Sequence, residues 1–152
     1  LCGMHMMDSC RIEKGYRHFG HDITCEDHVL EAGLGFAVKS DKQGFLGRDA
    51  VIAKKEKGLE MRMAQFLLKD AEPLLYHNEP IVRDGEIVGY LSSGNYGHAL
   101  GGAVGMGYVP CKGEKTSELL ASSYEIDVAG SRVEAKISFK PLYDPTGART
   151  KA

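Results

Sequence analysis

Two hairpin patterns in the second half of the sequence constrain its fold more than any other feature. Asp84-Gly85 favours positive φ between two β-branched arms, and Ala129-Gly130 forms a second short turn between arms that alternate in polarity. The four arms are residues 81–83, 87–91, 124–128 and 132–139. These patterns predict two antiparallel hairpins.

Two further segments have the period-two pattern of strands. Residues 61–68 form one, and residues 102–109 combine β-branched residues with glycines that permit close backbone approach. Five or six short strands joined by hairpin turns are typical of a small antiparallel Greek-key barrel. We therefore expect residues 59–152 to form a barrel that could fold by itself.

The beginning of the sequence has a helical pattern instead. Residues 1–14 predict a helix, because Met6, Met7 and Cys10 recur at helical spacing. Such a stripe more often packs in a core than binds a cofactor. Gly15 is a suitable stop for this helix, since glycine readily adopts a left-handed cap.

The segment after this helix contains one predicted strand and one predicted helix. Residues 36–39 have the pattern of a short strand, and residues 48–55 that of a surface helix ended by Gly58. One helix and one strand cannot close a core, so residues 1–58 are expected to be a partial α/β, ferredoxin-like subdomain. The fold class is then α+β, with a boundary near residue 58 before the barrel of residues 59–152.

Composition narrows the function classes and the compartment. A net charge of -2 argues against nucleic-acid and polybasic membrane partners, which need a basic face. No apolar run approaches the ~20 residues of a membrane helix. The chain begins at Leu1 without a signal-peptide pattern, so we expect a piece of a longer polypeptide. Four cysteines without Cys-x-x-Cys spacing predict reduced thiols in a cytoplasmic or mitochondrial matrix compartment.

A group of possible metal ligands lies between residues 18 and 28. His18, His21, Cys25 and His28 are residue types that bind zinc. The segment lacks the paired spacing of structural zinc motifs, however. We therefore expect solvated or hydrogen-bonded histidines here and no metal site.

Glycine-rich and serine motifs do not predict a nucleotide site or a nucleophile. Residues 94–98 and 101–107 lack the G-x-G-x-x-G and Gly-Lys-Ser/Thr patterns, and a strand rather than a helix follows them. Turns and barrel curvature explain these glycines better. Ser92 and Ser93 have no G-x-S-x-G context and no assignable base.

Charges, aromatics and glycines are dense in residues 11–23, where Arg11 is the residue of most interest. It lies close to the apolar stripe of the predicted helix, so we expect it to be partly buried and to need an anionic or multi-acceptor partner. Two alternatives remain open. Arg11 forms an internal ion pair with Glu13, Glu31 or Asp22, or it binds a ligand carboxylate or the edge of a heteroaromatic ring.

Five motifs resemble the folate-binding aminomethyltransferase domain of the glycine cleavage T-protein family. They are RIEKGYRHFGHDI (residues 11–23), LEAGLGF (30–36), FLGRDA (45–50), GMGYVP (105–110) and PLYDP (141–145). The resemblance covers essentially the whole chain and corresponds to the C-terminal half of that domain. FLGRDA and PLYDP look closer to the C-terminal region of sarcosine and dimethylglycine dehydrogenases than to the free-standing T-protein.

This resemblance implies a tetrahydrofolate site in a central channel. Arg11, Glu31 and Tyr143 match family positions at this site and are the expected folate-binding residues. The family's catalytic aspartate and pterin-binding glutamate would precede Leu1, so no catalytic residue is expected in this chain. FAD would be bound by the absent N-terminal part of a dehydrogenase parent. The chain alone is therefore expected to be inactive.

Three functions remain as alternatives. The first is the C-terminal fragment of a flavin-dependent sarcosine/dimethylglycine-type dehydrogenase that passes a one-carbon unit from an N-methyl amine to tetrahydrofolate. The others are a free-standing aminomethyltransferase and a non-catalytic scaffold module. The expected partners are folate, an N-methyl amine and the N-terminal domains of the same polypeptide, with no nucleic acid and no membrane.

Overall fold

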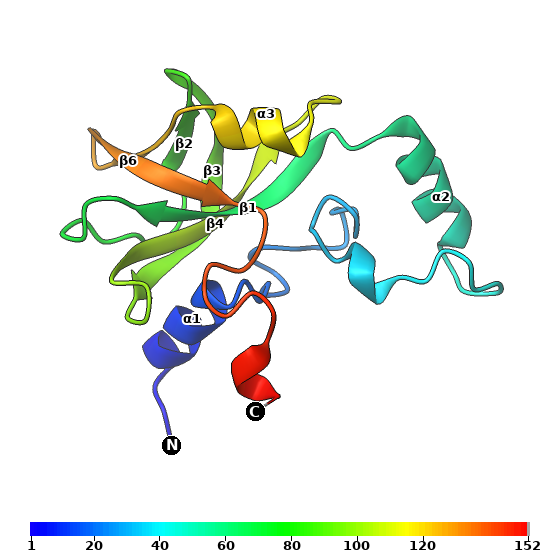
Figure 1. Ribbon diagram of the computed structural model, residues 1–152, viewed down its shortest axis with the longest axis horizontal. Coiled ribbons are helices and arrows are strands. Elements are labelled where there is room, and N and C mark those ends of the chain that lie inside the picture. Colours follow the sequence, from blue (N-terminus) through cyan, green and yellow to red (C-terminus); the bar gives the residue numbers. More distant parts are fainter. Residues whose placement is uncertain (152) are drawn as a thin grey trace.

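Six antiparallel strands close into a barrel in the second part of the chain (Figure 1). The computed structural model describes residues 1–151. The order around the barrel is β1–β4–β3–β2–β5–β6, and β6 pairs back with β1. The strands are β1 (Met61–Leu68), β2 (Pro80–Arg83), β3 (Glu86–Gly97), β4 (Gly102–Pro110), β5 (Tyr124–Val128) and β6 (Ser131–Ser138). The predicted α+β class with a Greek-key barrel is confirmed. Strands β2, β3 and β4 form a meander, and β1 pairs with β4 at the end of this meander, as in a Greek key.

Both predicted hairpins form, and their turns have positive φ. Asp84 and Gly85 have φ of 51° and 92°, and Ala129 and Gly130 have φ of 52° and 87°. Two consecutive positive values are typical of the type I′ turn, whose twist matches that of the flanking strands. Asp127 Oδ1 also accepts a hydrogen bond from the Gly130 N–H at 2.8 Å, which stabilises the second turn.

The barrel interior forms the main hydrophobic core. Alternate residues of β1 face it, and the Phe66 ring packs against Tyr124 with a centroid distance of 5.7 Å. Its buried members are Ala64, Phe66, Leu68, Leu75, Ile81, Leu91, Ala103, Val109, Tyr124, Ile126, Ala135 and Ile137. The period-two pattern of β1 is therefore explained by one face packed inside the barrel.

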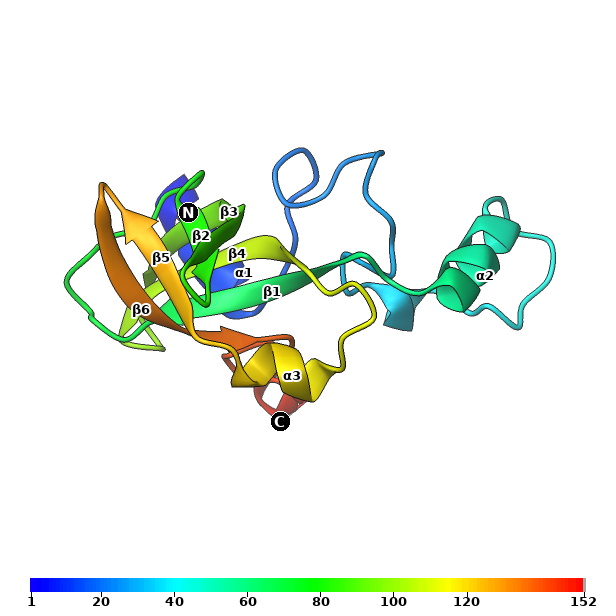
Figure 2. The same ribbon diagram turned by 90° about the horizontal axis from the view of Figure 1, so that it is seen from above.

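Helix α1 (Met4–Glu13) packs on the outer face of the barrel, chiefly on β3 and also on β4 (Figure 2). Ile12 of the helix is fully buried there against Met63, Val104 and Met106. Met63 faces outward because neighbouring strand residues point to opposite sides of the sheet. The first helix therefore shares a second, smaller core with the barrel.

The predicted burial of the methionine and cysteine stripe is wrong. Met6, Met7 and Cys10 are exposed, and the helix buries the face that carries Ile12 and Glu13 instead. The reason is partly polar, because the Glu13 carboxylate accepts backbone hydrogen bonds from the β3–β4 turn. These bonds and the burial of Ile12 fix the rotation of the helix on the barrel.

The expected strand over residues 36–39 is also wrong. The structure has a 3-10 helix there, η1 (Gly35–Ala37). The Ala37 N–H donates to the Leu34 carbonyl at 3.0 Å, and the Val38 N–H donates to the Gly35 carbonyl at 3.2 Å. Local turns therefore take up the backbone groups that a strand would offer to a neighbour.

Three further helical segments complete the fold. Helix α2 (Arg48–Lys57) forms as predicted and is followed by Gly58, with φ of 90°, and it extends away from the barrel (Figure 2). Helix α3 (Thr116–Ala121) connects β4 to β5 and was not predicted; η2 (Ala148–Thr150) follows the barrel. No helix within residues 1–151 is long and apolar enough to cross a membrane. The boundary near residue 58 stays a prediction.

Candidate functional site

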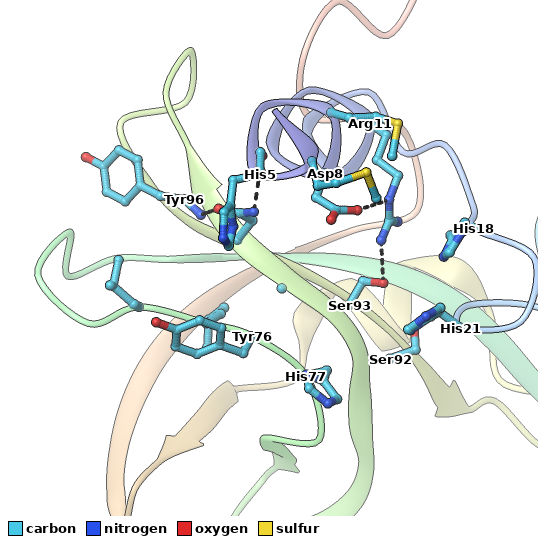
Figure 3. A pocket seen from close by; sticks show the side chains of 16 residues that line it. His5, Asp8, Arg11, His18, His21, Tyr76, His77, Ser92, Ser93 and Tyr96 are labelled. Atoms are coloured by element: carbon cyan, nitrogen blue, oxygen red, sulfur yellow. Dashed lines mark hydrogen bonds and ion pairs between the residues drawn. The ribbon is translucent and has the colours of Figure 1, made fainter. Parts of the chain in front are cut away.

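A hollow of about 470 Å³ lies between α1 and β3 (Figure 3). Helix α1, the loop that follows it, the β1–β2 connection and β3 all contribute to its wall. Its charged and imidazole side chains are His5, Asp8, Arg11, His18, His21 and His77. Tyr76, Tyr96, Met4 and Met7 add aromatic and thioether surface. This lining suits a ligand with both polar groups and a planar apolar part.

Arg11 is held by an internal network at the wall of this hollow. Its Nη1 donates to Asp22 Oδ2 at 2.8 Å, and its Nε donates to Asp8 Oδ1 at 2.8 Å. Its Nη2 donates to Ser93 Oγ at 2.9 Å. The expectation of a partly buried arginine is confirmed, since 14% of its side chain is exposed. Of the candidate internal partners, Asp22 is the one that binds it.

Asp22 is the buried centre of the network. Its side chain is fully buried, and it accepts hydrogen bonds from Arg11, from the His18 backbone N–H at 2.8 Å and from Ser92 Oγ at 2.6 Å. Ser92 and Ser93 both reach this cluster although consecutive strand residues normally face opposite sides. A β-bulge between Leu91 and Ser93 explains this, because it interrupts the alternation.

Glu31 belongs to a different part of the structure. Its Oε1 accepts hydrogen bonds from the backbone N–H groups of Glu60 at 2.7 Å and Met61 at 3.1 Å, and it pairs with Lys54 at 2.9 Å. Burial alone would raise the pKa of Glu31, but the bonds from Lys54 and the two amides outweigh it and lower the pKa below its ordinary value. Glu31 therefore ties α2 to the start of β1.

Replacing Glu31 with glutamine should reduce the free energy of unfolding by about 1 kcal/mol at pH 7. Because the pKa of Glu31 is lower in the folded chain than in the unfolded chain, the carboxylate stabilises the fold at every pH above the unfolded pKa of ~4.3. This contribution is lost as the pH falls through the pKa of the folded state. The gap between wild type and variant should therefore close below about pH 4. Urea unfolding at several pH values would measure it, with the exposed Glu56→Gln as control; a gap independent of pH would contradict the assignment.

A second hollow, of about 410 Å³, contains Glu31 in its wall together with Asp22, Asp27 and Tyr108. Burial, with the nearby Asp27 carboxylate, raises the pKa of Tyr108, so its hydroxyl stays protonated at neutral pH. Arg11 does not line this second hollow. Glu31 and Arg11 therefore line two neighbouring hollows and do not share one.

Tyr143 lies near the C-terminal end of α1. Its backbone N–H donates to the Glu13 carbonyl at 3.2 Å, and its hydroxyl accepts a hydrogen bond from Arg149 Nη1 at 3.0 Å. The adjacent Asp144 binds Lys14 Nζ through its carboxylate at 2.8 Å. Tyr143 lines neither of the two hollows, so the structure does not bring the three predicted site residues together.

The possible metal ligands are dispersed among other partners. The rings of His18 and His21 stack with a centroid distance of 4.7 Å, and Cys25 is exposed and free. Within residues 1–151 no group of three or more His, Cys, Asp or Glu side chains has the arrangement of a metal site. His28 Nδ1 instead accepts a hydrogen bond from the Leu30 N–H at 3.2 Å.

The glycine-rich segments are explained by close packing of β3 against β4. A Cβ at Gly107 would lie 2.6 Å from the Tyr90 carbonyl oxygen, and one at Gly105 would lie 2.6 Å from Leu91 Cδ1. These glycines therefore serve close approach within the barrel. None of them opens a helix, as a phosphate-binding loop requires.

Family models match most of the chain. Residues 62–144 match the glycine cleavage T-protein C-terminal barrel domain, and residues 1–42 match the GCVT N-terminal domain. The solved structure of glycine cleavage system aminomethyltransferase T from Bartonella henselae superimposes with a TM-score of 0.76. At 23% identity, over 91% of this chain and 38% of that one, this likeness shows the fold.

Two curated relatives are similar over almost the whole chain. One is 4-methylaminobutanoate oxidase (formaldehyde-forming) of Paenarthrobacter nicotinovorans, 39% identical over 99% of this chain. The other is the mitochondrial sarcosine dehydrogenase of Homo sapiens, 33% identical over 98% of this chain. The matched regions are only 18% and 17% of those two proteins, so the chain spans a small part of each relative's length.

Proposed function

The chain belongs to the glycine cleavage T-protein family, and from this premise we propose that it forms the tetrahydrofolate-binding part of an N-methyl amine dehydrogenase. The proposed reaction transfers a one-carbon unit from the amine to tetrahydrofolate. Two relatives whose names describe oxidation of N-methyl amines support the dehydrogenase branch.

The observation that carries this proposal is the hollow beside Arg11. Its volume of about 470 Å³ is in the range of small-molecule sites, roughly 300–1,000 Å³. Arg11 and Ser93 provide polar contacts, and Tyr76 and Tyr96 provide aromatic surface for a fused ring. The residues present therefore fit tetrahydrofolate as the bound substrate.

Arg11 has the central role in the proposed site. A guanidinium fixed by two carboxylates loses little conformational entropy on binding, so it can orient a ligand at low cost. Tetrahydrofolate held at one place reacts with an activated one-carbon unit faster than freely diffusing folate does. Glu31 and Tyr143 stay predicted folate contacts, although their bonds in this structure tie segments of the fold together.

The described residues do not fit FAD. The glycine-rich segments of β3 and β4 are packed against each other, and no glycine-rich turn between a strand and a helix is found within residues 1–151. FAD would be bound by other domains of the same polypeptide, and its chemistry would be oxidation of the N-methyl group.

Exposed apolar side chains support contact with such domains. Met4, Met6, Phe36 and Leu46 are all more than half exposed. Isolated exposed apolar residues are common, but these lie on α1 and on the segment that leads to α2, outside the barrel core. A cytoplasmic or mitochondrial matrix location is part of the same proposal.

The second candidate function is a free-standing aminomethyltransferase. The structural similarity to an aminomethyltransferase from Bartonella henselae favours it to the extent that the fold is shared. The two functions differ in flavin content. Anaerobic addition of sarcosine or dimethylglycine to the full polypeptide should bleach flavin absorbance if it is a dehydrogenase, and no bound flavin would favour the transferase.

Substitution of Arg11 tests the folate site directly. We expect Arg11→Ala to weaken tetrahydrofolate binding about 30-fold, or ~2 kcal/mol, because a hydrogen bond from a charged group is lost. Titration calorimetry under anaerobic conditions would measure the affinity of wild type and variant. Arg11→Lys keeps a cation beside Asp22 and serves as the folded comparison, with an intermediate loss. Equal affinities of wild type and both variants would contradict the proposal, and so would wild type that binds no tetrahydrofolate.

A further inference from the structure

Arg11 has one N–H group at the wall of the hollow that is not used by the protein. A guanidinium has five N–H groups. Four of those of Arg11 are used, by Asp8, Asp22, the Tyr16 carbonyl and Ser93. One N–H on Nη2 remains without an acceptor within residues 1–151. A carboxylate prefers two parallel bonds from an arginine, and Arg11 cannot offer them here without breaking its own network.

Ser93 provides a second free donor beside the first. It is a buried residue, only 4% exposed, and its Oγ accepts the hydrogen bond from Arg11 Nη2. Its own hydroxyl proton has no acceptor among the described residues. Because Ser93 also lines the hollow, this proton can be donated to an acceptor of a bound ligand.

The bulge in β3 is what places this hydroxyl at the hollow. The register shift between Leu91 and Ser93 lets both serines face the arginine cluster, where Ser92 binds Asp22 and Ser93 binds Arg11. Bulges commonly re-aim side chains beside functional sites. The two serines therefore have different roles, one in the buried network and one at the hollow.

The local charge does not favour an anion. Two carboxylates, Asp8 and Asp22, face one guanidinium, so the three groups together carry a charge of −1. No lysine and no second arginine lines the hollow in the described part of the chain. A ligand carboxylate bound at this cluster would therefore add to a net negative charge, and of the other residues that line the hollow only the imidazoles of His5, His18, His21 and His77 can carry a positive charge.

We infer that Arg11 and Ser93 together bind a neutral carbonyl oxygen of the ligand and not a carboxylate. One carbonyl oxygen has two lone pairs, which match the one free N–H of Arg11 and the Ser93 hydroxyl. The inference rests on the proposed function, because it names the part of tetrahydrofolate that this site recognises. Tetrahydrofolate has two such carbonyl oxygens, one on the pterin ring and one on the benzoyl amide. The carboxylates of its glutamate are the anionic groups that would compete for the same donors.

Three small probes separate these groups. 6-Methyltetrahydropterin carries the ring carbonyl, 4-aminobenzamide carries an amide carbonyl, and glutarate carries only carboxylates. We expect at least one neutral probe to bind the wild-type chain in calorimetry, with an affinity that changes less than twofold between low and high salt. Glutarate should neither bind nor compete. Tight glutarate binding, or no binding of either neutral probe, would overturn the inference.

Variants of Ser93 complete the test. Ser93→Ala should weaken the neutral probe about three- to tenfold, since one hydrogen bond is lost. Ser93→Thr keeps the hydroxyl and should restore most of the affinity. Ser117→Ala, an exposed serine of α3, is the matched control and should change nothing. Equal probe affinities of wild type and Ser93→Ala would refute the assignment.

Tetrahydrofolate itself distinguishes this inference from the proposed function. If it binds wild type and Ser93→Ala equally well, the folate function stands and the Ser93 assignment fails. If it does not bind but a neutral probe does and depends on Ser93, the carbonyl site stands and the ligand is a different neutral carbonyl compound. If wild type binds neither tetrahydrofolate nor a neutral probe, both the proposed function and the carbonyl site are rejected.

Discussion

Replacing Asp22 with alanine should lower the free energy of unfolding by about 3–5 kcal/mol, because it breaks a buried ion pair from one side. The Asp22 side chain is fully buried and accepts bonds from Arg11, the His18 N–H and Ser92. Its removal leaves Arg11 paired only with the partly exposed Asp8 and leaves the His18 amide without its acceptor. Urea unfolding at pH 7, followed by circular dichroism, would measure the change.

Three further variants separate charge from packing at Asp22. Asp41→Ala removes an exposed carboxylate and should cost less than ~0.5 kcal/mol. Asp22→Asn keeps the shape of the side chain and should cause an intermediate loss. The double variant Arg11→Met/Asp22→Ala should recover part of the stability, since no unpaired charge remains. A loss below about 1 kcal/mol for Asp22→Ala would show that the cluster is hydrated and not a buried network.

The barrel could be predicted from the sequence because its signals are local. Asp84-Gly85 lies between β-branched arms, so turn type, strand pairing and register all follow from a few neighbouring residues. The second hairpin has the same property. Closure of the barrel by β6 on β1 follows once all strands have one face buried.

The outer layer was predicted less well because it depends on distant contacts. The spacing of Met6 and Met7 marks an apolar face, but Ile12 and Glu13 decide which face meets the barrel. Their partners lie in β4 and in the β3–β4 turn, far along the chain. Residues 36–39 have strand propensity, but no strand of residues 1–151 pairs with them, so local turns form instead.

The candidate site also combines a contact that the sequence predicts with contacts that it does not. The chemistry of Arg11 predicted a buried partner, and Asp22 was among the alternatives, because both lie in one dense segment. From the sequence, Ser92 and Ser93 are recognisable only as possible nucleophiles. Their real place depends on the bulge in β3, which no composition or spacing rule in the sequence indicates.

Replacing Gln65 with leucine should cost about 2–3 kcal/mol, since it removes a buried amide that connects three distant segments. Gln65 is 5% exposed, and its Nε2 donates to the Ile12 and Glu13 carbonyls at the end of α1. Its Oε1 accepts a hydrogen bond from the Leu142 N–H at 2.9 Å. The amide thus satisfies carbonyls that a helix end leaves open, and it pins the C-terminal segment to β1.

Leucine has a similar volume, so the expected loss is chiefly that of unsatisfied backbone groups. Gln43→Leu, at an exposed position, is the matched control and should be nearly neutral. A single urea transition with an unchanged slope would show that α1 and the barrel unfold together. A separate early transition in Gln65→Leu would instead mark residues 1–58 as an independent unit, and the boundary predicted near residue 58 would then have a physical basis.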